Sequence, residues 1–151
     1  TPYAIDETLV TGYTFVSITG DEKCPAALGG TVTLEEGDDI TCTIKNDDTA
    51  PKLTLVKDPT NDDGGNALPD DFLLTVDGNV VLSGVKNTYA ANDPLAIDET
   101  QLTGYEFVSI TGAGCPAALG DTITLNEGDD ITCTITNIGR ASCRERVCTV
   151  V

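Results

Sequence analysis

The chain has 151 residues, of which 25 are acidic and 8 are basic, so its formal net charge is −17. Nucleic acids and anionic lipids are bound by basic surfaces, so we expect neither as a partner. No apolar run is long enough for membrane insertion, histidine is absent, and no glycine-rich phosphate loop follows an expected strand. We therefore predict no catalysis on an external substrate and no cofactor.

The distribution of residue types indicates an all-β protein. Thr, Val and Ile are spread along the chain, and Gly/Asp clusters interrupt them at short intervals. No window keeps the 3.6-residue apolar period of a helix.

An internal repeat defines the domain organisation. Residues 4–46 return with few changes as residues 96–137, and the segment between the copies occurs once. The simplest interpretation is one complete β-sandwich repeat at 50–138, preceded by a partial repeat at 1–49 that corresponds to the C-terminal half of such a domain. On this interpretation the chain is a fragment of a longer tandem array.

The complete repeat divides into short strands at its turn signals. Asp77-Gly78 is a typical hairpin signal between two of them. The spacing favours an antiparallel Greek-key sandwich of the Ig-like kind. The expected strands are 52–58, 72–76, 80–85, 94–100, 103–110, 121–125 and 130–137.

Four cysteines occupy equivalent places in the two copies. Cys24 and Cys42 are 18 residues apart, as are Cys115 and Cys133. Repeated pairs in a chain without histidine favour disulfides over zinc, and hence an oxidising compartment. Free buried thiols in a cytosolic protein are the alternative.

Three polar side chains share the phase of the apolar residues on their strands, near strand ends. They are Lys57, Glu99 and Asn137, and the partial repeat has Glu7 and Asn46 at matching positions. Burying an unpaired charge costs several kcal/mol, so such groups must pair or react. A lysine buried in an apolar core has a lowered pKa, and the neutral amine can attack an amide.

The order of a lysine ending the first strand, "ETxxxGY" in the middle and "TxTN" at the end resembles the prealbumin-like (SpaA/CnaB-type) domains of bacterial surface proteins. The resemblance implies an isopeptide bond formed once per molecule, with Lys57 as nucleophile, Asn137 as electrophile and Glu99 as proton shuttle. The proline common before "GY" is missing here. The alternative is an unreacted Lys–Glu ion pair, with the asparagine capping a strand end.

An acidic loop at 58–65 is a weak calcium candidate, with further aspartates nearby at 70 and 71. Asn/Asp/Gly clusters are also ordinary turn formers, so we expect no metal. The "EGDD" stretches at 36–39 and 127–130 are expected to be hairpin turns. The calcium candidates are Asp58, Asn61, Asp62 and Asp63.

Residues 139–151 match nothing in the repeat, and they resemble a translated sequencing adapter. We interpret this tail as an artefact, with a divergent extension as the alternative. We therefore assign no function to Cys143 or Cys148.

Together with the repeat and the cysteine pairs, the resemblance implies a structural stalk or spacer module of an extracellular adhesin or fibre at the cell surface. Its partners would be neighbouring repeats and a host or surface ligand that the sequence does not identify. The alternative is an extracellular module that binds glycan, protein or calcium through its loops. Tyr13 and Tyr105 are expected to pack at a domain edge rather than form a sugar platform.

Overall fold

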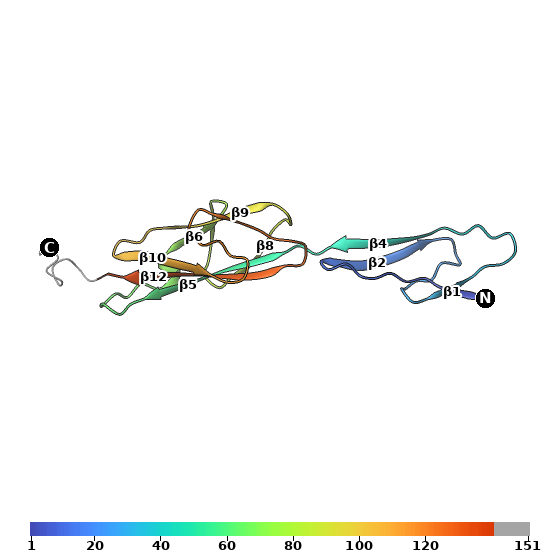
Figure 1. Cartoon of the computed structure of the whole chain (residues 1–151), viewed down its shortest axis with the longest axis horizontal. Helices are drawn as coiled ribbons and strands as arrows, with labels where there is room; N and C mark the ends of the chain where they lie inside the picture. The colour runs from blue at the N-terminus through green and yellow to red at the C-terminus, as the bar shows by residue number, and fades with distance from the viewer. Residues whose placement is uncertain (141–151) are drawn as a thin grey trace, which may run out of the picture. The chain divides into compact units, whose positions relative to one another are not determined.

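The computed structural model describes residues 1–140 and divides the chain into two compact units, Thr1–Ala50 and the part from Pro51 onward (Figure 1). Strands make up both units, and the short 3-10 turn η1 (Pro69–Asp71) is the one helical element within residues 1–140. In that part of the chain, no helix has the length and apolar character needed to cross a membrane.

The second unit is a sandwich of two four-stranded sheets, which confirms the predicted all-β class. The first sheet has the order β10-β12-β5-β8, built from β5 (Lys52–Thr60), β8 (Lys86–Thr88), β10 (Tyr105–Thr111) and β12 (Asp130–Gly139). The second has the order β11-β9-β6-β7, built from β6 (Leu73–Val76), β7 (Asn79–Val81), β9 (Pro94–Thr100) and β11 (Thr122–Thr124).

The first and last strands of this unit, β5 and β12, are neighbours and run parallel. The other pairings of the two sheets are antiparallel. In the parallel pair Lys57 lies opposite Ile135, and Asn137 lies opposite Pro59. Lys57 and Asn137 are therefore two register positions apart, on adjacent strands.

One expected strand, 80–85, is wrong from residue 82 onward. The Asp77-Gly78 hairpin forms with both residues at positive φ, but β7 ends at Val81. The chain then turns at Gly84, whose N–H donates to the Leu55 carbonyl at 2.8 Å. The sequence did not predict β8, which follows this turn and pairs with β5.

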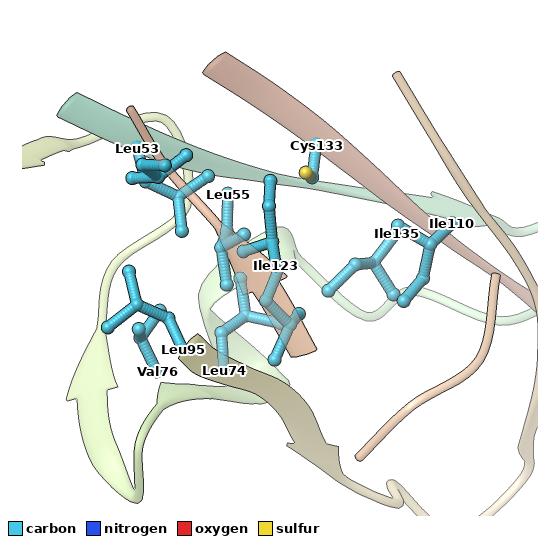
Figure 2. Packing of buried hydrophobic residues seen from close by; sticks show 11 residues of the cluster. Leu53, Leu55, Leu74, Val76, Leu95, Ile110, Ile123, Cys133 and Ile135 are labelled. Atoms are coloured by element: carbon cyan, nitrogen blue, oxygen red, sulfur yellow. The ribbon is translucent and has the colours of Figure 1, made fainter. Parts of the chain in front are cut away.

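The core of the second unit lies between the two sheets. Leu53 and Leu55 of β5 point to the same side as Cys133 and Ile135 of β12, toward the strands of the facing sheet (Figure 2). This is the period-2 alternation of strands with one buried face. The buried cluster comprises Leu53, Leu55, Leu74, Val76, Leu95, Ile97, Ile110, Ile123, Leu125, Cys133 and Ile135.

The first unit contains the counterparts of half of each sheet. β1 (Pro2–Ala4) pairs with β3 (Thr31–Thr33) as β9 pairs with β11, and β2 (Tyr13–Gly20) pairs with β4 (Cys42–Asp48) as β10 pairs with β12. Even the register irregularity recurs, between Phe15 and Ser17 in one unit and between Phe107 and Ser109 in the other.

One identical stretch adopts different structure in the two units. "IDET" at 97–100 is the second half of β9 and pairs with β6, whereas "IDET" at 5–8 belongs to no strand. Within the first unit nothing corresponds to β6. Whether this stretch forms a strand therefore depends on pairing with β6 and not on the local sequence alone.

Candidate cross-linking site

The three polar residues predicted to face inward come together in the second unit. Lys57 belongs to β5, Glu99 to β9 and Asn137 to β12, so the site joins the two sheets. All three residues are buried, and the side chains of Lys57 and Glu99 are 0% exposed. The inward phase read from the sequence is confirmed.

Glu99 bridges the other two groups. The Lys57 ammonium donates to Oε2 of Glu99 at 2.6 Å, and the Asn137 amide nitrogen donates to Oε1 of the same carboxylate at 2.6 Å. A hydrogen bond to each of its oxygens holds the Glu99 carboxylate and links the Lys57 and Asn137 side chains through it.

Phe72, which the sequence analysis did not single out, closes one side of the site. Its ring centroid lies 4.2 Å from the Lys57 nitrogen, within the range of a cation–π contact. Burial away from water lowers the pKa of Lys57, and the hydrogen bond to Glu99 partly opposes this shift. The apolar surroundings thus make deprotonation of Lys57 easier than it is in water, and the neutral amine is the form that acts as a nucleophile.

The Asn137 carbonyl oxygen is buried and has no hydrogen-bond partner within the described part of the chain. Leaving such a group unsatisfied costs about 1–3 kcal/mol. Buried unsatisfied groups are rare in folded proteins and call for a specific explanation. Here the unsatisfied oxygen belongs to the carboxamide that shares the Glu99 carboxylate with Lys57.

A loop next to the site is fixed by Tyr105, a contact that the sequence did not reveal. The Tyr105 hydroxyl donates to the Asn61 side-chain oxygen and accepts from the Ala67 N–H at 3.0 Å. The Asn61 amide in turn donates to the Ala67 carbonyl at 3.1 Å. The Tyr105 ring packs edge-on against Phe72, with centroids 5.2 Å apart, so the loop is tied to the residue that covers Lys57.

This arrangement also bears on the calcium candidates Asp58, Asn61, Asp62 and Asp63. Asn61 uses its side chain to hold the loop instead of presenting it to an ion. Across residues 1–140 there is no group of three or more His, Cys, Asp or Glu side chains placed to hold a metal.

The two predicted disulfides are present. Cys24 bonds to Cys42 and Cys115 bonds to Cys133, with Cα–Cα distances of 5.8 Å in both. Gly112 lies beside the second disulfide at φ +131°, and a Cβ there would meet the Thr132 carbonyl and the Cys115 sulfur. Cys143 and Cys148 lie outside the described residues.

The first unit has the carboxylate and the amide of the site but not the lysine. The Asn46 amide nitrogen donates to Oε2 of Glu7 at 3.1 Å. Oε1 of Glu7 is buried and has no partner among residues 1–140.

The fold and the site together define a β-sandwich domain whose first and last strands, β5 and β12, are neighbours. Each of these strands contributes one buried polar side chain that is hydrogen bonded to Glu99. The family model described as a prealbumin-like fold domain, of the SpaA type, matches residues 48–135, and the chain belongs to this family.

Among solved structures, the chain is similar to the major pilin protein (T3.2) from Streptococcus pyogenes serotype GAS13637. The TM-score is 0.41 and the sequence identity 15%, over 89% of this chain and 65% of the pilin. The chain thus spans less than two thirds of that protein. No curated protein matches the sequence.

Proposed function

We propose that the second unit is a structural stalk or spacer module of an extracellular surface protein, and that it locks itself with one amide bond between Lys57 and Asn137. One observation carries the proposal: Lys57 and Asn137 each bind one oxygen of the same buried carboxylate, that of Glu99. The reaction would occur once in each molecule, so it is maturation of a structural protein and not turnover of a substrate.

The chemistry requires only these three side chains. Glu99 takes a proton from the Lys57 ammonium, and the neutral amine attacks the side-chain carbonyl carbon of Asn137. The bond from this carbon to Nδ2 breaks as Glu99 passes its proton to the departing nitrogen, which leaves as ammonia. Glu99 then takes the second proton that Nζ loses when it becomes an amide. Holding the reactants together in a dry core supplies the orientation that an intermolecular reaction lacks.

The position of the bond suits a module that carries tension. A pull that enters at Pro51 and leaves at Gly139 would pass along β5 to Lys57, across the new bond to Asn137, and out along β12. The residues between Lys57 and Asn137 would then carry no load. Closing a loop of about 80 residues also stabilises the fold by about 4.5 kcal/mol in the chain-entropy model.

Three features support an extracellular location and neighbouring repeats as partners. Both disulfides fit an oxidising environment. The surface is strongly acidic, which favours solubility. The chain belongs to the SpaA-type prealbumin-like family, and we extend to it, as part of the proposal, the place in surface proteins that the family resemblance implies.

The test is the intact mass of the denatured, reduced chain. We expect the loss of one ammonia, with Lys57 and Asn137 in one linked fragment after proteolysis. Lys57→Ala, Asn137→Ala and Glu99→Ala should each abolish the loss. Lys52→Ala is the matched control, because Lys52 lies on the same strand but is exposed. An unshifted mass in a folded chain would leave an unreacted polar cluster and contradict the proposal.

A further inference from the structure

The strand that carries Lys57 loses its neighbour on one side before it reaches the site. β8 pairs with β5 at Lys52, Leu53 and Thr54, and within residues 1–140 no strand pairs with that edge of β5 beyond Thr54. On the other side, β12 continues alongside β5 as far as Thr60. Because Lys57 is buried, its backbone N–H needs a partner that is not a strand.

A tight turn at residues 82–85 provides this partner. Gly84 has the positive φ of +78° that the third position of a type II turn requires. The Gly84 N–H donates to the Leu55 carbonyl at 2.8 Å, and the Ser83 hydroxyl accepts from the Lys57 N–H at 2.8 Å. A side-chain oxygen thus takes the place that a paired strand would have beside Lys57.

The turn is itself held by η1. The Asp70 carboxylate, in η1, accepts from the Ser83 N–H at 3.0 Å. Phe72 follows η1 directly, and its ring covers the Lys57 ammonium. One short segment therefore holds the backbone of Lys57 through Asp70 and Ser83, and covers its side chain through Phe72.

We propose that Ser83 is a positioning residue for the cross-linking reaction, an inference that rests on the proposed function. Its hydroxyl binds the backbone of Lys57 and makes no hydrogen bond to the ammonium or to Asn137 within the described residues. It holds the end of β5 in the place from which the amine reaches the carboxamide on β12. A displacement of about 1 Å between reacting groups can slow a reaction about 100-fold.

The experiment follows the reaction in the full chain as it folds from denaturant, in which no cross-link has formed. At each time point a short protease pulse removes unfolded molecules and acid stops the reaction. The intact mass then gives the share of folded molecules that have lost ammonia. We expect Ser83→Ala to lower the rate at least about tenfold, and Ser83→Thr, which keeps the hydroxyl, to restore it.

Two readouts separate positioning from a general loss of stability. Asp129→Ala is the matched control, because it removes the same kind of bond in another turn of this unit, from the Asn126 N–H to the Asp129 carboxylate at 2.8 Å. This control should leave the rate unchanged. The pH profile of the rate should keep its midpoint in Ser83→Ala, because the hydroxyl does not bind the ammonium.

Asp70→Ala removes the support of the turn and leaves Ser83 in place. It should slow the reaction to a smaller extent, and it carries the test if Ser83→Ala does not fold.

The outcomes separate this inference from the proposed function. Wild-type molecules that fold without losing ammonia contradict the proposed function, and this inference with it. A wild type that reacts, together with folded Ser83→Ala that reacts at the same rate, overturns the inference alone. Equal slowing in Asp129→Ala, a shifted midpoint of the pH profile, or no recovery in Ser83→Thr would also overturn it, because the effect would not come from the bond to the Lys57 backbone.

Discussion

The Lys57 ammonium and the Glu99 carboxylate lie 2.6 Å apart, with both side chains withdrawn from water. Neither β5 nor β9 could bury its polar residue alone, because an isolated charge in a core costs several kcal/mol. Each group is acceptable only where the other is present. At this point the two sheets are therefore held together by an ion pair as well as by apolar packing.

Removing Glu99 should destabilise the second unit strongly. In the Asn137→Ala background, where no bond can form, Glu99→Ala leaves Lys57 buried without its partner, and breaking such a pair costs about 3–5 kcal/mol. The free energy of unfolding in urea, followed by circular dichroism, measures the effect. The matched control is Glu7→Ala in the first unit, where no lysine contacts the carboxylate and Glu7 is half-buried, so its loss should be much smaller. Equal losses would contradict the assigned pairing.

The stability of the uncross-linked second unit should rise with pH. In Asn137→Ala no bond can form, and burial keeps the pKa of folded Lys57 below its ordinary value of 10.5. Between these two pKa values the unfolded chain binds more protons than the folded chain, so the free energy of unfolding increases with pH and levels off above 10.5.

The comparison that isolates this effect is Asn137→Ala against Asn137→Ala/Lys57→Met. Burial raises the pKa of Tyr89, which opposes the trend at high pH but is common to both variants. The difference in unfolding free energy between the two should vary with pH as described. A flat difference would show that Lys57 titrates alike in the folded and unfolded states.

Each disulfide should stabilise its own unit. Cys115–Cys133 closes a loop with a sequence separation of 18, which is worth about 3 kcal/mol in the chain-entropy model. The double variant Cys115→Ala/Cys133→Ala should lower the midpoint of unfolding of the second unit, measured by calorimetry. Cys24→Ala/Cys42→Ala is the internal control and should affect the first unit instead. A shift of the same transition by both variants would be inconsistent with two independent units.

From the sequence, the buried face of each strand could be predicted better than the strand with which it pairs. Alternation placed Lys57, Glu99 and Asn137 inward because a one-residue slip would expose the apolar residues on the same strands. Alternation says nothing about which strand lies beside which, so the parallel contact of β5 with β12 came from the structure. The contact of Phe72 with Lys57 was likewise unpredictable, because it depends on how the segment after a long loop returns to the core.

Tyr105 and Tyr13 stand in the same "TGY" motif, yet they have different partners. The Tyr105 hydroxyl holds Asn61 and Ala67, whereas the Tyr13 hydroxyl makes no side-chain hydrogen bond within residues 1–140. Gly65 lies so close to the Tyr105 hydroxyl that a Cβ there would collide with it. This difference could not be predicted from the "TGY" motif, because the loop that supplies the partners of Tyr105 occurs only once in the chain.

Tyr105→Phe should therefore loosen the loop at residues 61–67 while preserving the ring contact with Phe72. The Ala67 N–H and the Asn61 oxygen each lose a partner, which should cost about 1–3 kcal/mol in total. Amide hydrogen exchange at Ala67 should accelerate, and the free energy of unfolding should fall. Tyr13→Phe, the matched control, should change stability little because its hydroxyl has no comparable bonds. If both variants behave alike, the Tyr105 hydroxyl does not hold the loop over the cross-linking site.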